Sequence, residues 1–253
     1  MRFRHACFLL PALALGALLL AAGPGSAPGR SRTLGIDVSR FDGTIRWSPV
    51  AGSGVEFAFV EASRGDGDDC TVKPRRCGAD PQYERNYEGA RSEGIPVGAY
   101  HRAFTGGSLR ADVREDARTE ADLFVGQVGE LRDGDLLPVL DVETPFGGLT
   151  PGELRLWLRT WLERVRKELG AKPIIYTNLS SWRATGNTRE FARAGHVLWV
   201  AHWRVSRPRA PAGNWSGRGW SVWQFTNGGR AKGIDGRVDK DRLRAGFGKI
   251  RVG

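Results

Sequence analysis

The stretch Leu136-Leu-Pro-Val-Leu-Asp-Val-Glu143 decides the fold class, because a continuous apolar run ends there in two carboxylates. Continuous apolar runs, rather than alternating ones, indicate strands buried on both faces, as in parallel sheets. Residues i and i+2 of a strand point to the same side and lie about 7 Å apart. We therefore predict that Asp141 and Glu143 project together from the end of a buried strand.

Six further runs of this kind are spread along the chain, with amphipathic stretches between them. The runs occupy residues 34–38, 57–60, 95–100, 173–176, 197–201 and 221–225. Helical patterns cover residues 81–93, 108–125 and 150–169, and the last opens with a capping box and a proline at the first helical position. Alternation of strands and helices over about 220 residues predicts a parallel α/β fold, and the number of strands favours a barrel.

The composition is that of a soluble globular protein and excludes a disordered chain. Hydrophobic residues make up 40% of the 253 and charged residues 26%, and nine tryptophans are spread along the sequence. The net charge of +10 favours polyanionic partners. Nucleic acid is not the predicted partner, because the sequence has neither a recognition motif nor a block of Lys and Arg. An anionic cell envelope suits the charge equally well and fits export better.

The N-terminus has the order of a secretory signal peptide, to which we assign residues 1–27. Basic residues precede an apolar run of about 17 residues, and a stretch rich in small residues follows at 23–29. The cleavage position stays open, because Pro24 and Pro28 disfavour two candidate sites. An uncleaved membrane anchor is the alternative, although the run is at the short limit for a span. Cleavage predicts a protein that is secreted or periplasmic, associated with the cell wall and without a stable membrane anchor.

Cysteine usage agrees with export. Cys7 lies in the signal segment, which leaves Cys70 and Cys77 in a loop rich in Gly, Asp and Arg. Two cysteines at this spacing suit a local disulfide in an oxidising compartment, and two free thiols are the alternative. No metal site is predicted, because the loop has no histidine to complete a ligand set.

Active sites of parallel barrels lie at the carboxyl ends of the strands, and this sequence has acids and aromatic residues at those positions. The set comprises Asp37, Glu61, Tyr100, His101, Asp141, Glu143, Tyr176, Asn178, His202, Trp203, Gln224 and Asp235. Two adjacent carboxylates shift each other's proton affinity, so one can stay protonated while the other is ionised. Glycoside hydrolysis requires that pairing, and we predict that Asp141 and Glu143 provide it.

Four short motifs, taken together in their order and spacing, resemble the family 25 glycoside hydrolases, which are bacterial and phage N-acetylmuramidases or lysozymes. The motifs are Gly35-Ile-Asp-Val-Ser39, Gly98-Ala-Tyr-His101, Trp223-Gln-Phe-Thr226 and Gly233-Ile-Asp-Gly-Arg-Val-Asp239. The resemblance covers nearly the whole chain after the signal segment, and we assign residues 33–248 to the catalytic domain. It implies an irregular TIM-like barrel with eight strands and fewer helices, which fits the sparse helical patterns after residue 195.

The resemblance also implies roles for the acids. Glu143 matches the general acid/base, and Asp141 would orient the substrate's 2-acetamido group, which attacks the anomeric carbon in place of a protein nucleophile. Asp37 and Asp235 match the remaining acids of the cleft. Asp239 is close enough to Asp235 in sequence to be the participant instead.

The predicted substrate-binding set consists of aromatic and polar residues that follow or end strands. It contains Tyr100, His101, Tyr176, Trp203, Trp223, Gln224 and Asp239. Flat rings at these positions can stack on sugar faces, and core packing is the alternative for each ring. No metal and no cofactor is predicted. Two departures from the family pattern concern the cleft: the second strand ends Val60-Glu-Ala-Ser-Arg64 where relatives often have a lysine and a threonine–glutamate pair, and Arg102 lies beside the cleft.

The predicted function is cleavage of peptidoglycan between N-acetylmuramic acid and N-acetylglucosamine, by a monomer that binds glycan strands. Family 18 chitinases are excluded, because their fourth strand requires acids where this chain has Leu136 and Val139. A catalytically inactive cell-wall-binding protein on the same fold is the alternative. Loss of a cleft acid would favour that alternative, but all the acids that the resemblance requires are present.

Overall fold

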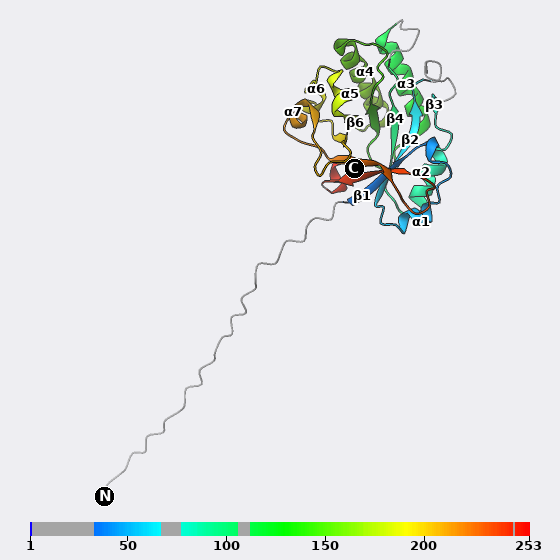
Figure 1. Cartoon of the computed structure of the whole chain (residues 1–253), viewed down its shortest axis with the longest axis vertical. Coiled ribbons are helices and arrows are strands. Elements are labelled where there is room, and N and C mark those ends of the chain that lie inside the picture. The colour runs from blue at the N-terminus through cyan, green and yellow to red at the C-terminus, as the bar shows by residue number, and fades with distance from the viewer. Residues whose placement is uncertain (2–32, 67–76, 106–111, 245) are drawn as a thin grey trace. The chain divides into compact units, whose positions relative to one another are not determined.

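The structure is a computed structural model that describes residues 33–66, 77–105, 112–244 and 246–253, together with Met1 (Figure 1). The predicted signal peptide after Met1 lies outside the described residues, and so does Cys70. From residue 33 onwards, the chain follows the order of strands and helices that the apolar runs and helical patterns predicted.

Eight strands form a closed barrel, around which the chain passes in sequence order. They are β1 (Thr33–Val38), β2 (Phe57–Arg64), β4 (Val97–Arg102), β5 (Val139–Val142), β6 (Ile174–Asn178), β7 (Leu198–Ala201), β8 (Val222–Gly229) and β9 (Val238–Leu243). Neighbouring strands from β1 to β8 are parallel, whereas β9 closes the barrel by pairing antiparallel with both β8 and β1. A short strand, β3 (Gly78–Ala79), pairs with the end of β2. The prediction of an irregular eight-stranded α/β barrel is confirmed.

Each of the seven apolar runs overlaps one barrel strand, and β9 is the barrel strand that they did not predict. Its sequence, Val-Asp-Lys-Asp-Arg-Leu, places four charged residues between Val238 and Leu243. A strand buried on both faces beneath helices requires a continuous apolar run, but an antiparallel strand does not. Because β9 has no apolar run, the search for apolar runs did not predict it.

The inside of the barrel is filled by large rings. Phe59 and Trp199 stack with their centroids 4.6 Å apart, and Phe57 meets Phe59 edge to face. Gly35 and Gly98 provide the space for these rings, because a Cβ at Gly35 would lie 2.2 Å from the ring of Phe57. Since the interior is packed, inward-facing residues meet solvent at the ends of the strands.

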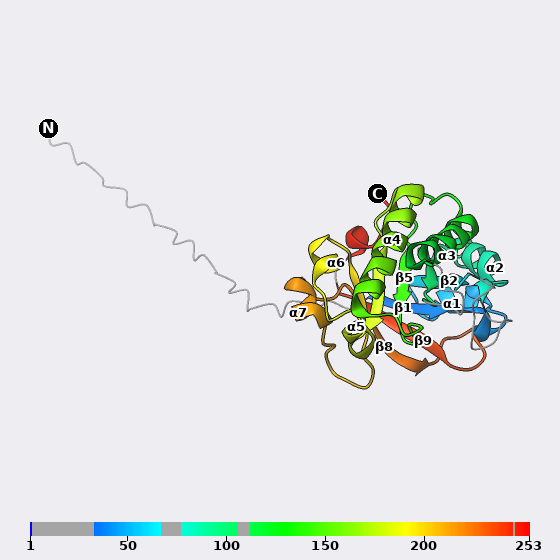
Figure 2. The same cartoon turned by 90° about the horizontal axis from the view of Figure 1, so that it is seen from above.

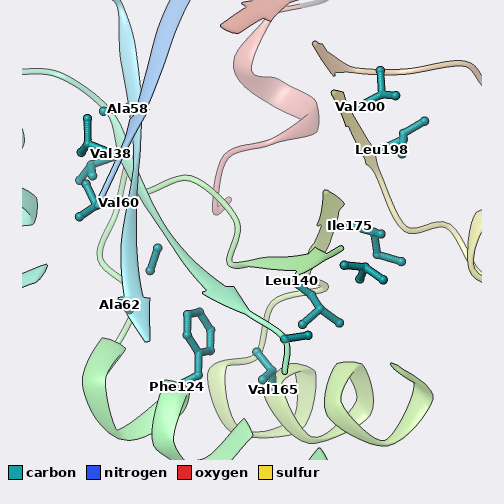
Figure 3. Close-up of a cluster of buried hydrophobic side chains, with 14 of the residues drawn as sticks. Val38, Ala58, Val60, Ala62, Phe124, Leu140, Val165, Ile175, Leu198 and Val200 are labelled. Atoms are coloured by element: carbon teal, nitrogen blue, oxygen red, sulfur yellow. The ribbon is translucent and has the colours of Figure 1, made fainter. Parts of the chain in front are cut away.

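A second apolar layer lies between the outside of the barrel and the helices. The two long helices α3 (Val113–Val128) and α4 (Pro151–Leu169) pack side by side (Figures 1 and 2). Figure 3 shows Phe124 of α3 and Val165 of α4 beside outward-facing strand residues such as Leu140. The predicted capping box at Thr150 begins α4, whereas α3 begins after an Asp112 cap, later than predicted.

The other described helices are shorter. They are η1 (Arg40–Asp42), α1 (Trp47–Ala51), α2 (Tyr83–Ser92), α5 (Leu179–Arg183), α6 (Glu190–Arg193), α7 (Pro211–Ser216) and η3 (Phe247–Lys249). The described helices after residue 195, α7 and η3, span six residues or fewer, as the sparse helical patterns there predicted. Among the described residues, no helix combines the length and the apolar character that crossing a membrane requires.

Candidate active site

A cavity of about 130 Å³ lies at the carboxyl ends of the parallel strands, and residues on or directly after all eight barrel strands line it. Five of its lining residues are carboxylates: Asp37, Glu61, Asp141, Glu143 and Asp239. Its other lining residues are Arg64, Tyr100, Arg102, Tyr176, Trp199 and Gln224. The structure therefore brings together most of the acids that the sequence placed at strand ends.

Asp141 and Glu143 face the same cavity, as their i, i+2 spacing predicted, and a guanidinium joins them. Nη1 of Arg102 donates hydrogen bonds to Oδ2 of Asp141 at 3.1 Å and to Oε2 of Glu143 at 2.6 Å. Asn178, at the end of β6, donates from Nδ2 to Oε1 of Glu143 at 3.1 Å. The side chain of Glu143 is 24% exposed and that of Asp141 is 10% exposed, so Glu143 is the more accessible of the two.

The surroundings of Asp141 set its proton affinity. Burial, with a smaller contribution from the charge of Glu143, raises the pKa of Asp141 to about 7 against the opposing effect of Arg102. Burial disfavours the charge on Arg102, but Asp141 and Glu143 outweigh burial and raise the pKa of the guanidinium. Arg102 is therefore a permanent cation, while Asp141 can hold a proton close to neutral pH.

A second group of acids lies where β1 meets β9. Nε2 of Gln224 donates to Oδ2 of Asp37 at 2.9 Å and to Oδ2 of Asp239 at 3.2 Å. Asp241 is fully buried, and its Oδ1 accepts a hydrogen bond from Nε1 of Trp199 at 2.8 Å. Burial, followed by the neighbouring carboxylates, raises the pKa of Asp37 well above its ordinary value, that of Asp239 to about 7 and that of Asp241 to about 8. This group therefore retains protons at neutral pH.

Glu61 lines the cavity from β2, the strand between β1 and β4, and its side chain is buried completely. It forms an ion pair with Arg64, accepts a hydrogen bond from the hydroxyl of Tyr100 at 3.3 Å and lies 3.7 Å from Nη2 of Arg40. Two residues of the stretch that departs from the family pattern, Glu61 and Arg64, thus form an ion pair with each other. Together with Arg102, Arg64 gives the cavity two guanidinium groups.

The aromatic residues predicted to bind sugar divide between two places. Tyr100 and Tyr176 line the cavity, and the hydroxyl of Tyr176 donates to Oε1 of Gln224 at 3.0 Å. Trp203 donates from Nε1 to the same oxygen at 2.9 Å, but its half-exposed ring lines a neighbouring pocket. Trp199, which the sequence analysis did not assign to the site, completes the cavity wall.

The structure does not bring Asp235 to the cavity. Its side chain is 89% exposed and lies 3.7 Å from Nη2 of Arg46. Asp235 precedes β9, whereas Asp239 lies within it and is paired with Asp37 of β1 in the barrel register. The sequence analysis named both acids as candidates. Because β9 begins at Val238, Asp239 lies on the strand and lines the cavity, whereas Asp235 does not.

His101 and Trp223 are also placed differently from the prediction. His101 is fully buried on the outside of the barrel, where Nε2 lies 2.6 Å from Oε2 of Glu120 and Nδ1 lies 2.8 Å from Oγ of Ser63. Trp223 belongs to the outer apolar layer and donates from Nε1 to the carbonyl oxygen of His202 at 2.8 Å. His101 follows the inward-facing Tyr100, and Trp223 precedes the inward-facing Gln224. Because successive strand residues point to opposite faces, both side chains point outward.

Asp241 was missed by the sequence analysis, although a signal for it exists. It is two residues after Asp239 on the same strand, so the two must share a face. Cys77 is disulfide-bonded, but its predicted partner Cys70 lies outside the described residues, so the pairing stays a prediction. In the described ranges, no group of three or more His, Cys, Asp or Glu side chains could hold a metal ion.

A cavity lined by paired carboxylates at the carboxyl ends of barrel strands suits glycosidic bond cleavage, and comparison with known families shows that the protein is a glycoside hydrolase. The family model described as Glycosyl hydrolases family 25 matches residues 36–234. The chain belongs to this family, as the sequence motifs indicated.

Individual relatives agree with this assignment. Lysozyme M1 of Streptomyces globisporus is 32% identical over 223 residues, which cover 85% of this chain and 69% of the relative. The crystal structure of a bacterial lysozyme from Streptomyces coelicolor is 32% identical, has a TM-score of 0.73 and aligns over 85% of this chain and 94% of that one. A muramidase structure from Trichobolus zukalii is 25% identical, with a TM-score of 0.70 and coverage of 85% and 95%.

Proposed function

We propose that the chain cleaves the β-1,4 bond between N-acetylmuramic acid and N-acetylglucosamine in peptidoglycan, with retention of configuration through substrate-assisted catalysis. Similar proteins are named lysozyme, muramidase and N,O-diacetylmuramidase, which supports peptidoglycan as the substrate. The observation that carries the proposal is the accessible carboxylate of Glu143, held by Arg102 and Asn178 beside the more deeply buried Asp141.

In the proposed first step, protonated Glu143 gives its proton to the glycosidic oxygen as the bond to the anomeric carbon breaks. The carbonyl oxygen of the sugar's 2-acetamido group attacks the anomeric carbon and forms a cyclic oxazolinium ion. Asp141 orients the acetamido group and carries the compensating charge as that ion forms. N-acetylglucosamine departs with the new hydroxyl group at the end of its strand.

In the second step, the carboxylate of Glu143 takes a proton from water, and the water oxygen attacks the anomeric carbon. The carbon–oxygen bond of the oxazolinium ring breaks, the acetamido group is restored, and the muramic acid residue gains a free reducing end. Asp37 and Asp239, joined by Gln224, form the opposite part of the cavity and are proposed to hold the sugar in place.

The test is product analysis. Purified protein is incubated with peptidoglycan, the soluble products are reduced with borohydride, and mass spectrometry identifies the reduced sugar. Reduced muramic acid ends are expected, whereas reduced N-acetylglucosamine ends would contradict the bond assignment. Glu143→Gln serves as the matched variant, because it preserves shape and hydrogen bonding. It should fold and bind the wall while kcat falls by roughly 10²- to 10⁴-fold.

The same experiment separates the enzyme from an inactive cell-wall-binding protein. Wall binding without any soluble product from the wild-type chain would favour the binding protein. Turnover by Glu143→Gln at the wild-type rate would reject Glu143 as the acid/base.

A further inference from the structure

A second pocket, of about 400 Å³, lies directly beside the cavity that holds the carboxylates. Its polar lining residues come from the end of β6 with α5 and from the loop after β7: Asn178, Ser180, Arg183, His202, Trp203 and Arg209. No carboxylate belongs to the lining, in contrast to the five in the neighbouring cavity.

Hydrogen bonds fix the loop that forms one wall of this pocket. Nδ1 of His202 accepts from the backbone N–H of Arg209 at 3.0 Å, which closes the loop on itself. The carbonyl oxygen of His202 accepts from Trp223 in the outer apolar layer, and Nε1 of Trp203 donates to Gln224 in the cavity. The ring of Trp203 is held in one orientation although it is 41% exposed.

The two arginines of the pocket differ from those of the cavity. Arg64 and Arg102 are paired with carboxylates of their own chain. Arg183 and Arg209 are exposed, and within the part of the chain that the structure describes no carboxylate lies at ion-pair distance from either. Their charges therefore face the pocket and solvent uncompensated, which favours an anionic ligand group.

Two residues connect the pocket to the proposed chemistry. Asn178 lines the pocket and donates to Glu143 at 3.1 Å. Trp203 lines the pocket and donates to Gln224, which in turn contacts Asp37 and Asp239. Since these two residues lie between the sites, a substituent on a sugar bound at Glu143 is directed toward the pocket across Asn178 or Trp203.

We propose that this pocket binds a carboxylate of the stem peptide that the muramic acid residue carries, with Arg183 and Arg209 as the binding groups. The inference rests on the proposed function, since it assigns the pocket to a substituent of the same substrate. It makes the enzyme selective for glycan that bears peptide with free carboxylates. Trp203 would then form the boundary between the sugar and its peptide.

The test uses three soluble tetrasaccharides of alternating N-acetylglucosamine and N-acetylmuramic acid. One carries stem peptides with free carboxylates, one carries the same peptides with amidated carboxylates, and one carries no peptide. The values of kcat/KM are measured for the wild type and for the double variant Arg183→Gln/Arg209→Gln. The control is Arg207→Gln, which removes one positive charge from the loop that carries Arg209, at an exposed residue outside the pocket.

For the wild type we expect kcat/KM on the free-carboxylate substrate to exceed that on the amidated one by roughly tenfold, the size of one charge-assisted hydrogen bond. The difference should lie in KM. In the double variant the ratio should fall close to one, and Arg207→Gln should keep the wild-type ratio. A wild-type ratio of one, or a ratio that survives the double substitution, overturns the proposal.

Failure of the proposed function has a different signature. In that case the wild type cleaves none of the three tetrasaccharides. Calorimetric titration of the wild type and the double variant with the same three compounds then decides the role of the pocket. Tighter binding of the free-carboxylate compound, lost in the double variant, supports the pocket, whereas equal binding of all three rejects it.

Discussion

Nη1 of Arg102 lies 2.6 Å from Oε2 of Glu143, so the carboxyl group proposed as the acid is in contact with a permanent cation. The same nitrogen lies 3.1 Å from Oδ2 of Asp141. This opposite charge favours the ionised form of Asp141 and lowers its pKa. The pH range in which the enzyme works should therefore depend on Arg102.

Replacing Arg102 by Gln should move the pH–rate profile toward higher pH. Arg102 lowers the pKa of Asp141, so its loss raises that pKa, and Asp141 loses its charge at a higher pH than in the wild type. Because the proposed mechanism needs the charge of Asp141, a shift of about 1 pH unit is expected in the acidic limb of kcat/KM. Arg102→Lys keeps a positive charge and should shift less. If Arg102→Gln leaves the profile in place, the cation does not govern the protonation of Asp141.

Asp141→Asn should lower kcat by roughly 10²-fold, because the neutral amide cannot carry the compensating charge as the oxazolinium ion forms. Asparagine keeps the shape of the side chain and one oxygen that can accept from Arg102. KM on soluble glycan fragments should change little. An unchanged kcat would transfer the stabilising role to Asp37 or Asp239, the other acids of the cavity.

Asp239→Asn and Asp235→Asn form a matched pair that separates the two acids of the last motif. Asp239 lines the cavity and accepts from Gln224, whereas the side chain of Asp235 is 89% exposed. We expect Asp239→Asn to lower kcat/KM by about 10²-fold and Asp235→Asn to retain the wild-type value. The reverse order of effects would show that Asp235, not Asp239, serves the cleft.

The buried acid Asp241 should make the fold less stable as pH rises. Its pKa is about 8 in the folded chain against an ordinary value of 3.8, so the folded state binds the proton more tightly than the unfolded state. The stabilisation from that proton is complete below the unfolded pKa and is lost as pH rises through the folded one. Stability should therefore fall between pH 5 and pH 9.

Asp241→Asn removes the titrating group and keeps an oxygen that can accept from Trp199. Thermal unfolding at pH 5 and pH 9 measures the effect, and the fall in Tm should be smaller in the variant by a few degrees. Asp235→Asn, which removes an exposed acid, is the control and should behave like the wild type. An identical fall in Tm for wild type and Asp241→Asn would contradict the assignment.

The sequence predicted the barrel because its parallel strands are continuous apolar runs, and it predicted that Asp141 and Glu143 share a cavity because they end such a run. It misplaced His101 and Trp223 because strand-end position was used without the alternation of faces. Tyr100 and Gln224, one position away from them, face the cavity. Successive residues of a strand point to opposite faces, so applying this alternation along each strand would have separated His101 and Trp223 from their inward-facing neighbours.

The alternation of strand faces could not have decided between Asp235 and Asp239. β9 is charged and lacks an apolar run, so nothing in the sequence marked Val238 as its first residue and Asp235 as part of the preceding loop. The contact between Arg102 and both acids likewise depends on the register between β4 and β5, in which Arg102 is paired with Asp141. Register between strands is a property of the assembled barrel and not of either segment alone.

The antiparallel pairing of β9 with β1 has a consequence for the order in which the molecule is made. Asp37 and Asp239 come from the first and the last strand of the barrel, and Gln224 joins them across the pairing of these strands. A chain still emerging from the ribosome therefore has an open barrel and an incomplete cavity. No fragment that ends before β9 can carry the whole set of acids.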